Sequence, residues 1–373
     1  MRKSILTIFL FIGYLVHSQT IAFVHDGITR DCNLHLPTGY NPANKYPLVL
    51  NLHGYTSNAL QQQFYTKMDS MADAAGFIVA YPNGVSNAWN SGFVGSYGTG
   101  IDDVEFISFL IDTIKTRYSV NDRRVYSCGM SNGGFQSYRM ACELNNKIAA
   151  IASVTGTFTD STKRYCNPGK TVPVMEVHGT ADGVVPYAGS VNMVPIEQTI
   201  AFWNANNGCS GASDTVLLPN TSTTDNSTVQ YIRFTSCSSG SENWFYRVIG
   251  GGHTWPGSIF DIPADITNRD FSASQAIWTF FNMYDLDGYV GFENRELSRK
   301  IYVLKQNPVG KTLYFSVPLE NTSIGIYDIN GRNLMFQSDF NGDAIELTNL
   351  ASGNYILKVS NKDFSSSSIF TKD

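Results

Sequence analysis

The chain has 373 residues, a formal net charge of -5 at pH 7 and 43% hydrophobic residues. The length favours two domains, and the composition suffices for a large core and excludes global disorder. The acidic balance and the lack of basic clusters argue against nucleic acid as a partner.

The N-terminus has the pattern of a signal peptide. Arg2 and Lys3 form a basic start, and the apolar run 5–16 that follows is too short to span a bilayer. The residues at 16–18 predict cleavage before Gln19, so residues 1–18 are expected to be removed during export. No later stretch reaches transmembrane length.

Residues 19–284 alternate apolar runs with amphipathic ones. The apolar runs lack polar alternation, which indicates a mostly parallel sheet with helices on both faces. The predicted strands are 20–24, 29–36, 46–52, 77–81, the run that ends at Met130, 149–154, 172–177 and 244–249. The predicted helices are 62–75, one that opens at Asp102 and Asp103, one after Ser131, 196–206 and 273–284, with a polar insertion at 208–242.

The pattern changes after residue 284. Residues 285–300 are polar and predict a linker, and residues 301–373 contain short runs that alternate with period two. Asn330-Gly331 is a strong hairpin signal. We therefore predict a small C-terminal β-sandwich. It contains no histidine or cysteine, and we assign it no chemistry.

The pentapeptide Gly129-Met130-Ser131-Asn132-Gly133 joins a predicted strand to a predicted helix. This G-x-S-x-G pattern is typical of a serine nucleophile on a sharp turn. Such a serine needs a base, and the base needs an orienting acid. Of the six histidines only His178 and His253 follow Ser131, and His253 ends the last predicted strand on a glycine-rich loop. We predict that His253 is the general base.

Asp182 is the predicted acid, because it lies at a strand end between Ser131 and His253 in the order that such sheets use. The alternative interpretation of Asp182 is that it only forms a turn, within the sequence Ala-Asp-Gly. Asp102 and Asp103 precede Ser131 and fit a helix N-terminus better.

An oxyanion hole requires two N–H groups. The backbone of Asn132 is expected to supply one, and the turn after the first buried strand supplies the other, which points to Tyr55 with Thr56 next to it. The aromatic side chains of Trp89 and Trp255 are candidates for walling a substrate pocket, with ordinary loop anchoring as the equal alternative.

A different chemistry is metal-dependent hydrolysis by His178, Asp182 and His253. Zinc sites favour short fixed spacings such as H-E-x-x-H, and the G-x-S-x-G pattern would then have no role. We expect no metal and no cofactor.

Six cysteines in an exported chain permit disulfides, and fifteen pairings are possible. Cys209 and Cys237 flank the polar insertion, and Cys142 and Cys166 bracket one strand and its loop. Cys32 and Cys128 lie in apolar runs, where buried thiols and a third bridge are both open.

Five ordered motifs between about residues 24 and 284 resemble the polyhydroxybutyrate-depolymerase-like esterase family, which includes feruloyl and acetylxylan esterases. The resemblance implies an α/β-hydrolase fold, the triad Ser131, Asp182 and His253, and the disulfides Cys209–Cys237 and Cys142–Cys166. The motifs are Leu52-His53-Gly54, Tyr81-Pro82-Asn83-Gly84, Gly129-Met130-Ser131-Asn132-Gly133-Gly134, His178-Gly179-Thr180-Ala181-Asp182 and Gly251-Gly252-His253-Thr254-Trp255-Pro256-Gly257.

The C-terminal part resembles the type IX secretion sorting domain of Bacteroidetes, an export signal that is often removed. It departs from that family at Lys305-Gln306, where Tyr-Pro is common. The motifs are Asn307-Pro308, Tyr327-Asp328-Ile329-Asn330-Gly331 and Leu350-Ala351-Ser352-Gly353-Asn354-Tyr355.

The sequence therefore predicts a secreted serine esterase at the cell surface or outside the cell, exported by the type IX machinery. The resemblance implies feruloyl or acetyl esters of plant cell-wall polysaccharide as substrates. The alternatives are a polyhydroxybutyrate depolymerase and a non-catalytic polysaccharide-binding protein with the same fold.

Overall fold

The computed structural model describes residues 19–93, 97–263, 265–290, 309–328, 332–360 and 365–372. The predicted signal peptide lies outside these residues. The chain divides into two compact units, Met1–Val290 and Gly291–Asp373, and each is described by itself.

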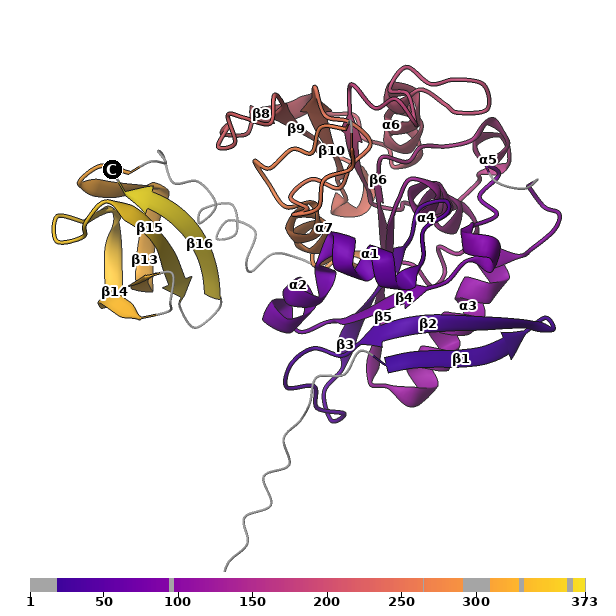
Figure 1. Ribbon diagram of the computed structural model, residues 1–373, viewed down its shortest axis with the longest axis horizontal. Coiled ribbons are helices and arrows are strands. Elements are labelled where there is room, and N and C mark those ends of the chain that lie inside the picture. The colour runs from indigo at the N-terminus through magenta and orange to yellow at the C-terminus, as the bar shows by residue number, and fades with distance from the viewer. Residues whose placement is uncertain are drawn as a thin grey trace, which may run out of the picture. The chain divides into compact units, whose positions relative to one another are not determined.

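The first unit is built on a ten-stranded sheet with the order β1-β2-β4-β3-β5-β6-β7-β10-β9-β8 (Figure 1). Strands β4, β3, β5, β6, β7 and β10 run parallel to one another, whereas β2 and β1 at one edge and β9 and β8 at the other pair antiparallel. This is the predicted α/β-hydrolase sheet. The strands are β1 (Gln19–His25), β2 (Ile28–His35), β3 (Tyr46–Leu52), β4 (Ile78–Pro82), β5 (Val120–Met130), β6 (Ala150–Val154), β7 (Val174–Gly179), β8 (Ser213–Leu217), β9 (Thr228–Phe234) and β10 (Asn243–Ile249).

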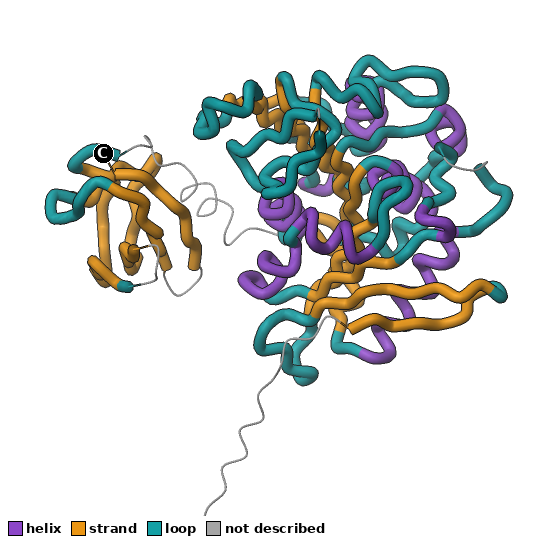
Figure 2. The backbone as a smooth tube through the Cα atoms, viewed as in Figure 1, coloured by secondary structure: helices purple, strands orange, loops and turns teal. Residues whose placement is uncertain are grey.

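Helices cover both faces of this sheet, as the unbroken apolar strands predict (Figures 1 and 2). Helix α2 packs against α7, and α3 packs against α4. The side chain of Asp102 caps α3 by accepting the N–H groups of Val104 and Glu105, as predicted. The helices are α1 (Ala59–Thr66), α2 (Met68–Ala75), α3 (Asp103–Arg117), α4 (Asn132–Glu143), α5 (Asp160–Tyr165), α6 (Ile196–Asn206) and α7 (Ala273–Phe281).

Two elements differ from the sequence prediction. The predicted helix 62–75 is two helices, because Lys67 adopts a left-handed conformation (φ 49°) that ends α1 and starts α2. The polar insertion 208–242 contains β8 and β9, which extend the sheet beyond β10. Every residue of β8 is exposed, so no hydrophobic alternation marks it as a strand.

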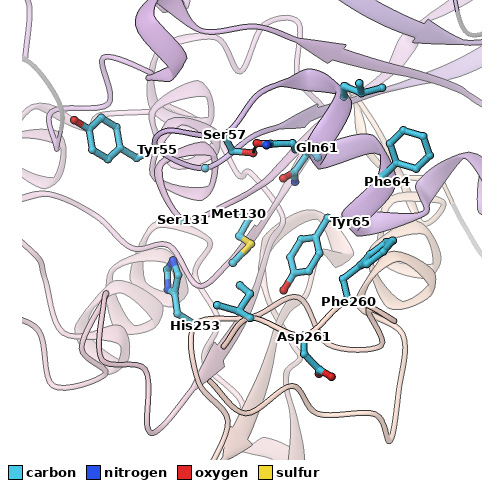
Figure 3. Close-up of a pocket in the computed structure, with 14 residues that line it drawn as sticks. Tyr55, Ser57, Gln61, Phe64, Tyr65, Met130, Ser131, His253, Phe260 and Asp261 are labelled. Atoms are coloured by element: carbon cyan, nitrogen blue, oxygen red, sulfur yellow. Dashed lines mark hydrogen bonds between the residues drawn. The ribbon is translucent and has the colours of Figure 1, made fainter. Parts of the chain in front are cut away.

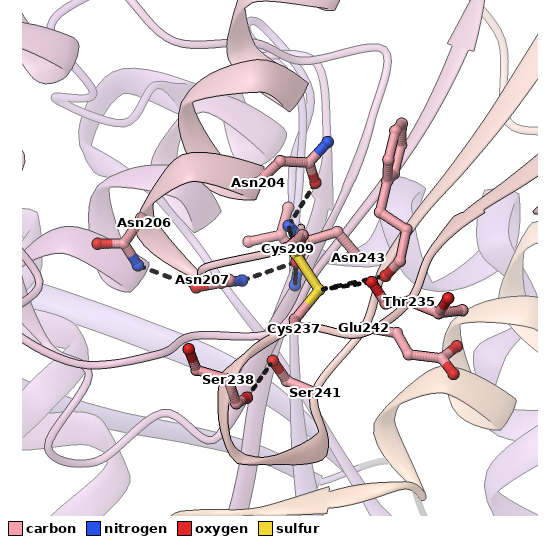
Figure 4. The surroundings of a disulfide bond; sticks show 12 residues. Asn204, Asn206, Asn207, Cys209, Thr235, Cys237, Ser238, Ser241, Glu242 and Asn243 are labelled. Carbon is pink, nitrogen blue, oxygen red and sulfur yellow. Dashed lines mark hydrogen bonds between the residues drawn. A yellow bond between two sulfur atoms is a disulfide. The ribbon is translucent and has the colours of Figure 1, made fainter. Parts of the chain in front are cut away.

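Two disulfides close loops of the first unit. Cys142 at the end of α4 bonds to Cys166 after α5, and Cys209 bonds to Cys237 at the base of the β8–β9 insertion (Figure 4). These are the two pairs that the resemblance implies. Cys32 and Cys128 are free and buried, which selects the thiol alternative for both.

The first unit continues beyond the predicted boundary at residue 284. Strands β11 (Tyr284–Asp285) and β12 (Gly288–Tyr289) form a short hairpin. The Arg123 side chain pairs with the Asp285 carboxylate, and the Arg123 backbone carbonyl accepts the Leu286 N–H at 2.9 Å. The predicted linker therefore starts too early, because a hairpin this short has too few residues to show a period.

The second unit is all-β, as predicted, although two facing sheets of the predicted sandwich are not seen among its described residues. Its described strands form one four-stranded sheet with the order β14-β13-β15-β16 around a separate apolar core. Residues 329–331, which hold the predicted Asn330-Gly331 turn, lie outside the described residues, and β13 pairs with β14 directly across them. The strands are β13 (Thr312–Asp328), β14 (Asn333–Glu346), β15 (Gly353–Ser360) and β16 (Ser365–Lys372).

Candidate active site

Ser131 stands on the sharp corner between β5 and α4. Its backbone has φ 53° and ψ −120°, a strained conformation for a residue with a side chain. The Ser131 N–H donates to the Val154 carbonyl at 2.8 Å, which ties the corner to the neighbouring strand β6. A sharp strand-to-helix turn of this kind exposes the serine side chain at the carboxyl edge of the sheet.

The glycines of the pentapeptide are required by backbone packing. A Cβ atom on Gly133 would lie 2.2 Å from the Leu52 carbonyl oxygen of β3. A Cβ atom on Gly129 would lie 2.6 Å from the Gly133 carbonyl carbon. Only glycine lets β3, β5 and α4 approach this closely.

Asp182 and His253 meet at the same edge of the sheet, after β7 and β10. His253 Nδ1 lies 2.8 Å from Asp182 Oδ2, and because a carboxylate accepts, Nδ1 carries the proton. The other Asp182 oxygen accepts the backbone N–H groups of Val184 and Val185, each at 2.8 Å. The carboxylate is therefore fixed by its own turn and leaves His253 Nε2 with a free lone pair.

A second acid holds the histidine loop in place. Asp265 Oδ1 accepts the His253 backbone N–H at 3.1 Å, and the Ile266 carbonyl accepts the Gly252 N–H at 2.9 Å. Sequence reasoning missed Asp265, because a loop acid that accepts from a backbone N–H leaves no motif.

The turn after β3 lies directly against Ser131, where the second oxyanion donor is expected. A Cβ atom on Gly54 would lie 3.5 Å from Ser131 Cβ. The Thr56 N–H already donates to the Asn87 carbonyl at 2.9 Å, which leaves Tyr55 as the candidate donor of this turn. Asn132 is the first residue of α4, where backbone N–H groups have no acceptor within the helix.

Asn132 also has a side-chain role that the sequence did not reveal. Its Oδ1 accepts the Trp89 backbone N–H at 2.7 Å, and its Nδ2 donates to Ser91 Oγ at 2.8 Å. The residue after the candidate nucleophile thereby holds the loop that follows β4.

The side chain of His53 supports the turn after β3. The buried ring accepts the Gly84 N–H through Nε2 at 3.0 Å, so Nδ1 carries the proton and donates to the Gly54 carbonyl at 2.7 Å. Burial lowers the pKa of His53 to about 4. The ring is therefore neutral near pH 7 and fixes the Gly54 turn.

A pocket of about 530 Å³ contains Ser131 and His253 (Figure 3). Its wall is formed mainly by apolar and aromatic side chains from α1, β5 and the loop 260–262. Such a wall suits the apolar part of a small ligand. The apolar and aromatic lining residues include Leu60, Phe64, Tyr65, Met130, Phe260 and Ile262.

Neither predicted tryptophan lines this pocket. Trp89 is fully buried and its Nε1 donates to the His53 carbonyl at 2.9 Å. It borders a separate hollow of about 360 Å³ that contains neither Ser131 nor His253. Trp255 is 1% exposed, and its Nε1 donates to Ser274 Oγ at 3.1 Å. Both side chains are loop anchors, because each indole N–H finds its acceptor inside the fold.

His178, one member of the alternative metal set, has no free ligand atom. His178 Nδ1 lies 3.0 Å from Glu176 Oε1, and His178 Nε2 lies 2.9 Å from the Val185 carbonyl. Both nitrogens of this ring are thus engaged, and a ligand needs a free lone pair.

Two family models match the chain. Residues 31–182, a segment that includes Ser131 and Asp182, match "Esterase PHB depolymerase". Residues 307–371 match "Secretion system C-terminal sorting domain". The sorting domain makes this an extracellular or cell-surface protein, as predicted. Among the residues that the structure describes, every helix is too short or too polar to cross a bilayer.

Three curated relatives carry esterase names. The bifunctional acetylxylan esterase/xylanase of Neocallimastix patriciarum is 29% identical over 71% of this chain and 35% of its own length. Feruloyl esterase B of Piromyces equi is 30% identical over 58% of this chain and 41% of its own length. The putative esterase NocK of Nocardia uniformis is 29% identical over 67% of this chain and 78% of its own length. The chain thus spans less than half of the first two.

Among solved structures, the acetyl xylan esterase of Aspergillus awamori is 14% identical with a TM-score of 0.49, over 71% of this chain and 99% of that one. The fold assignment rests on the strand order and the Ser131 corner instead. Residues 31–182 are thus similar to the PHB-depolymerase esterases and residues 307–371 to the secretion sorting domains, the two families that the sequence motifs resemble.

Proposed function

We propose that the protein is a secreted serine carboxylesterase with Ser131 as nucleophile, His253 as general base and Asp182 as orienting acid. The observation that carries this proposal is the 2.8 Å Asp182–His253 hydrogen bond beside the strained Ser131 corner. The three side chains come from the carboxyl ends of β5, β7 and β10, the edge at which α/β sheets bind ligands. The proposed acid and nucleophile both fall inside the segment that matches an esterase family.

The reaction follows from the free lone pair on His253 Nε2. Ser131 Oγ attacks the ester carbonyl carbon while its proton passes to Nε2. The oxyanion is held by the backbone N–H groups of Tyr55 and Asn132, and each such donor lowers the barrier by on the order of 3 kcal/mol. The alcohol leaves with the proton from Nε2, and water then releases the acid from Ser131 by the same steps.

The proposed substrates are feruloyl or acetyl esters of plant cell-wall polysaccharide, in line with the names of the relatives. The pocket beside Ser131 is far larger than an acetyl group requires and is walled by aromatic and aliphatic side chains. This volume favours the feruloyl ester over the acetyl ester.

A polyester is the second candidate substrate. Leu60, Phe64 and Phe260 line the pocket and are 54%, 62% and 47% exposed, so the pocket opens onto an apolar rim. Apolar rims of this kind suit contact with a hydrophobic polymer such as polyhydroxybutyrate.

The first test of catalysis is Ser131→Ala with Ser127→Ala as control. Ser127 lies on the same strand and its hydroxyl bonds to Ser137 Oγ, away from the pocket. We expect Ser131→Ala to lower kcat on a small acyl ester by about 10⁴-fold or more. Ser127→Ala should remain close to the parent. Equal activity of Ser131→Ala and the parent would disprove the triad, and a parent with no activity and no fluorophosphonate adduct would instead support a binding protein.

The substrate class is tested by comparing methyl ferulate, acetylated xylan and polyhydroxybutyrate as substrates. We expect the highest kcat/KM for the feruloyl ester. Activity on the polyester alone would replace the feruloyl assignment with a depolymerase.

A further inference from the structure

A buried ionisable pair lies directly behind the proposed acid. Glu176 and His178 are two residues apart on β7, so their side chains point to the same face, and both side chains are 0% exposed. Neither lines the pocket, and the proposed reaction uses neither. Burying two ionisable groups is unfavourable unless each is paired and hydrogen-bonded.

The hydrogen bonds fix where the protons of this pair lie. The Val185 carbonyl can only accept, so His178 Nε2, at 2.9 Å, carries a proton. A second proton lies between His178 Nδ1 and Glu176 Oε1 at 3.0 Å. The other Glu176 oxygen accepts the Tyr138 hydroxyl at 2.7 Å, so the carboxyl group is satisfied on both sides.

The pKa directions agree with this proton count. Burial raises the pKa of Glu176, although its hydrogen bond from His178 acts against this. Burial lowers the pKa of His178, but the hydrogen bond and charge of Glu176 outweigh it and the net direction is upward. Both directions keep the shared proton in the pair near neutral pH.

His178 contacts the Asp182 turn at two points. Its Nε2–H donates to the Val185 carbonyl, while the Val185 N–H donates to Asp182 Oδ1. The same Nε2 lies 3.5 Å from Asp182 Oδ2, the oxygen that binds His253. The Nε2–H of His178 therefore lies near the same carboxylate oxygen that binds His253.

We propose that His178 is a positioning residue: its Nε2–H locks the Asp182 turn and keeps the Asp182 carboxylate aimed at His253. Glu176 fixes the His178 ring so that this N–H cannot turn away. The inference rests on the proposed function, because it assigns a role to His178 only if Asp182 orients a catalytic base.

The test compares His178→Leu with His178→Gln and a control elsewhere. The Gln amide can still donate to the Val185 carbonyl, whereas Leu cannot. The control is Glu242→Gln, which weakens another buried ion pair, the one between Glu242 and Arg233. Neither of these two side chains lines the pocket. Readouts are thermal stability, kcat and KM on a small acyl ester, and the rate at which a fluorophosphonate labels Ser131.

We expect His178→Leu to lower kcat and the labelling rate by about 10- to 100-fold with little change in KM, because a small misplacement of a reacting group costs up to about 100-fold in rate. His178→Gln should recover much of this. Glu242→Gln should lose stability without losing kcat in the folded protein.

Three results would overturn the proposal: a folded His178→Leu with parental kcat, a loss confined to KM, or a kcat loss that Glu242→Gln matches. In each case Ser131→Ala would still be inactive. That result would show that the proposed esterase function holds and that only the role proposed for His178 is wrong. If neither His178 variant folds, ¹⁵N NMR of the parent decides. A His178 ring without a proton on Nε2 would contradict the proposal.

Discussion

At the scale of single residues, several polar side chains near Ser131 support backbone turns and have no expected contact with substrate. His53 holds the Gly54 turn, Asn132 holds the loop at Trp89, and Asp265 holds His253 by its backbone N–H. Each of these bonds joins residues whose positions must not drift if Ser131, the proposed base and the proposed oxyanion donors are to stay aligned. Preorganised donors of this kind are effective because they cost no reorganisation during the reaction.

His53 gives a pH-dependent prediction. Its pKa falls from 6.5 in the unfolded chain to about 4 in the folded protein because the ring is buried. The unfolded chain therefore binds a proton more readily between these values, so folding stability is fully present above about pH 6.5 and is lost as the pH falls towards 4. The loss attributable to this group is about 3 kcal/mol.

Urea unfolding at pH 7, 6, 5 and 4.5 measures this effect in the parent and in His53→Gln, whose amide can both donate and accept. Tryptophan fluorescence is a suitable signal because all five tryptophans precede residue 291 and report on the first unit alone. We expect the free energy of unfolding of His53→Gln to depend less steeply on pH than that of the parent. Identical slopes in the two proteins would show that His53 does not titrate in this way.

At the scale of elements, the Ser131 corner depends on the closeness of β3 and α4. Gly133→Ala would place a Cβ atom 2.2 Å from the Leu52 carbonyl, so either β3 or α4 must shift. We expect a loss of stability of about 3 kcal/mol, at the upper end for overpacking, and a lower kcat because Tyr55 follows β3.

Gly183→Ala is the matched control for this prediction. It lies beside Asp182, but a Cβ atom there would have no neighbour within 4 Å, and no positive φ makes a side chain unfavourable. We expect parental stability and kcat for Gly183→Ala. If both alanine variants behave alike in chemical unfolding and in ester hydrolysis, the stability and activity of the Ser131 corner do not depend on close backbone packing at Gly133.

The elements that the sequence predicts well are those whose pattern is local. The strands that lead to the site are mostly buried, and Ser131, Asp182 and His253 each follow one of them. Strand β8 was missed because it is fully exposed, and the break at Lys67 has no glycine or proline to mark it. These features depend on tertiary contacts, which override propensity.

The site residues divide in the same way. Chain order and strand ends suffice to select a base and an acid, whereas the contacts of Asp265, Asn132 and His178 join side chains to backbone groups of other turns. The two tryptophans illustrate a choice that the sequence leaves open. An aromatic residue in a loop near a site is equally able to anchor that loop, and the buried indole N–H bonds of Trp89 and Trp255 show that these do.

At the scale of the whole molecule, the two units have separate cores and separate tasks. The second unit has its own cluster of buried residues, including Leu313, Ile326 and Leu357. It has no histidine, cysteine or tryptophan, and it matches a sorting domain. The side chains proposed for catalysis and the lining of the pocket beside Ser131 all belong to the first unit.

We therefore expect a chain that ends at Val290 to hydrolyse a small acyl ester with a kcat/KM within about twofold of the parent, because every residue proposed for the reaction precedes that point. Ending the chain at residue 284 should instead destabilise the first unit. That cut removes Asp285 and Leu286, which bind Arg123 at the foot of β5, the strand that leads to Ser131. Steady-state kinetics and fluorescence-detected unfolding of both truncations distinguish these outcomes. A protein ending at Val290 that folds normally but has lost kcat would mean that the second unit takes part in the reaction.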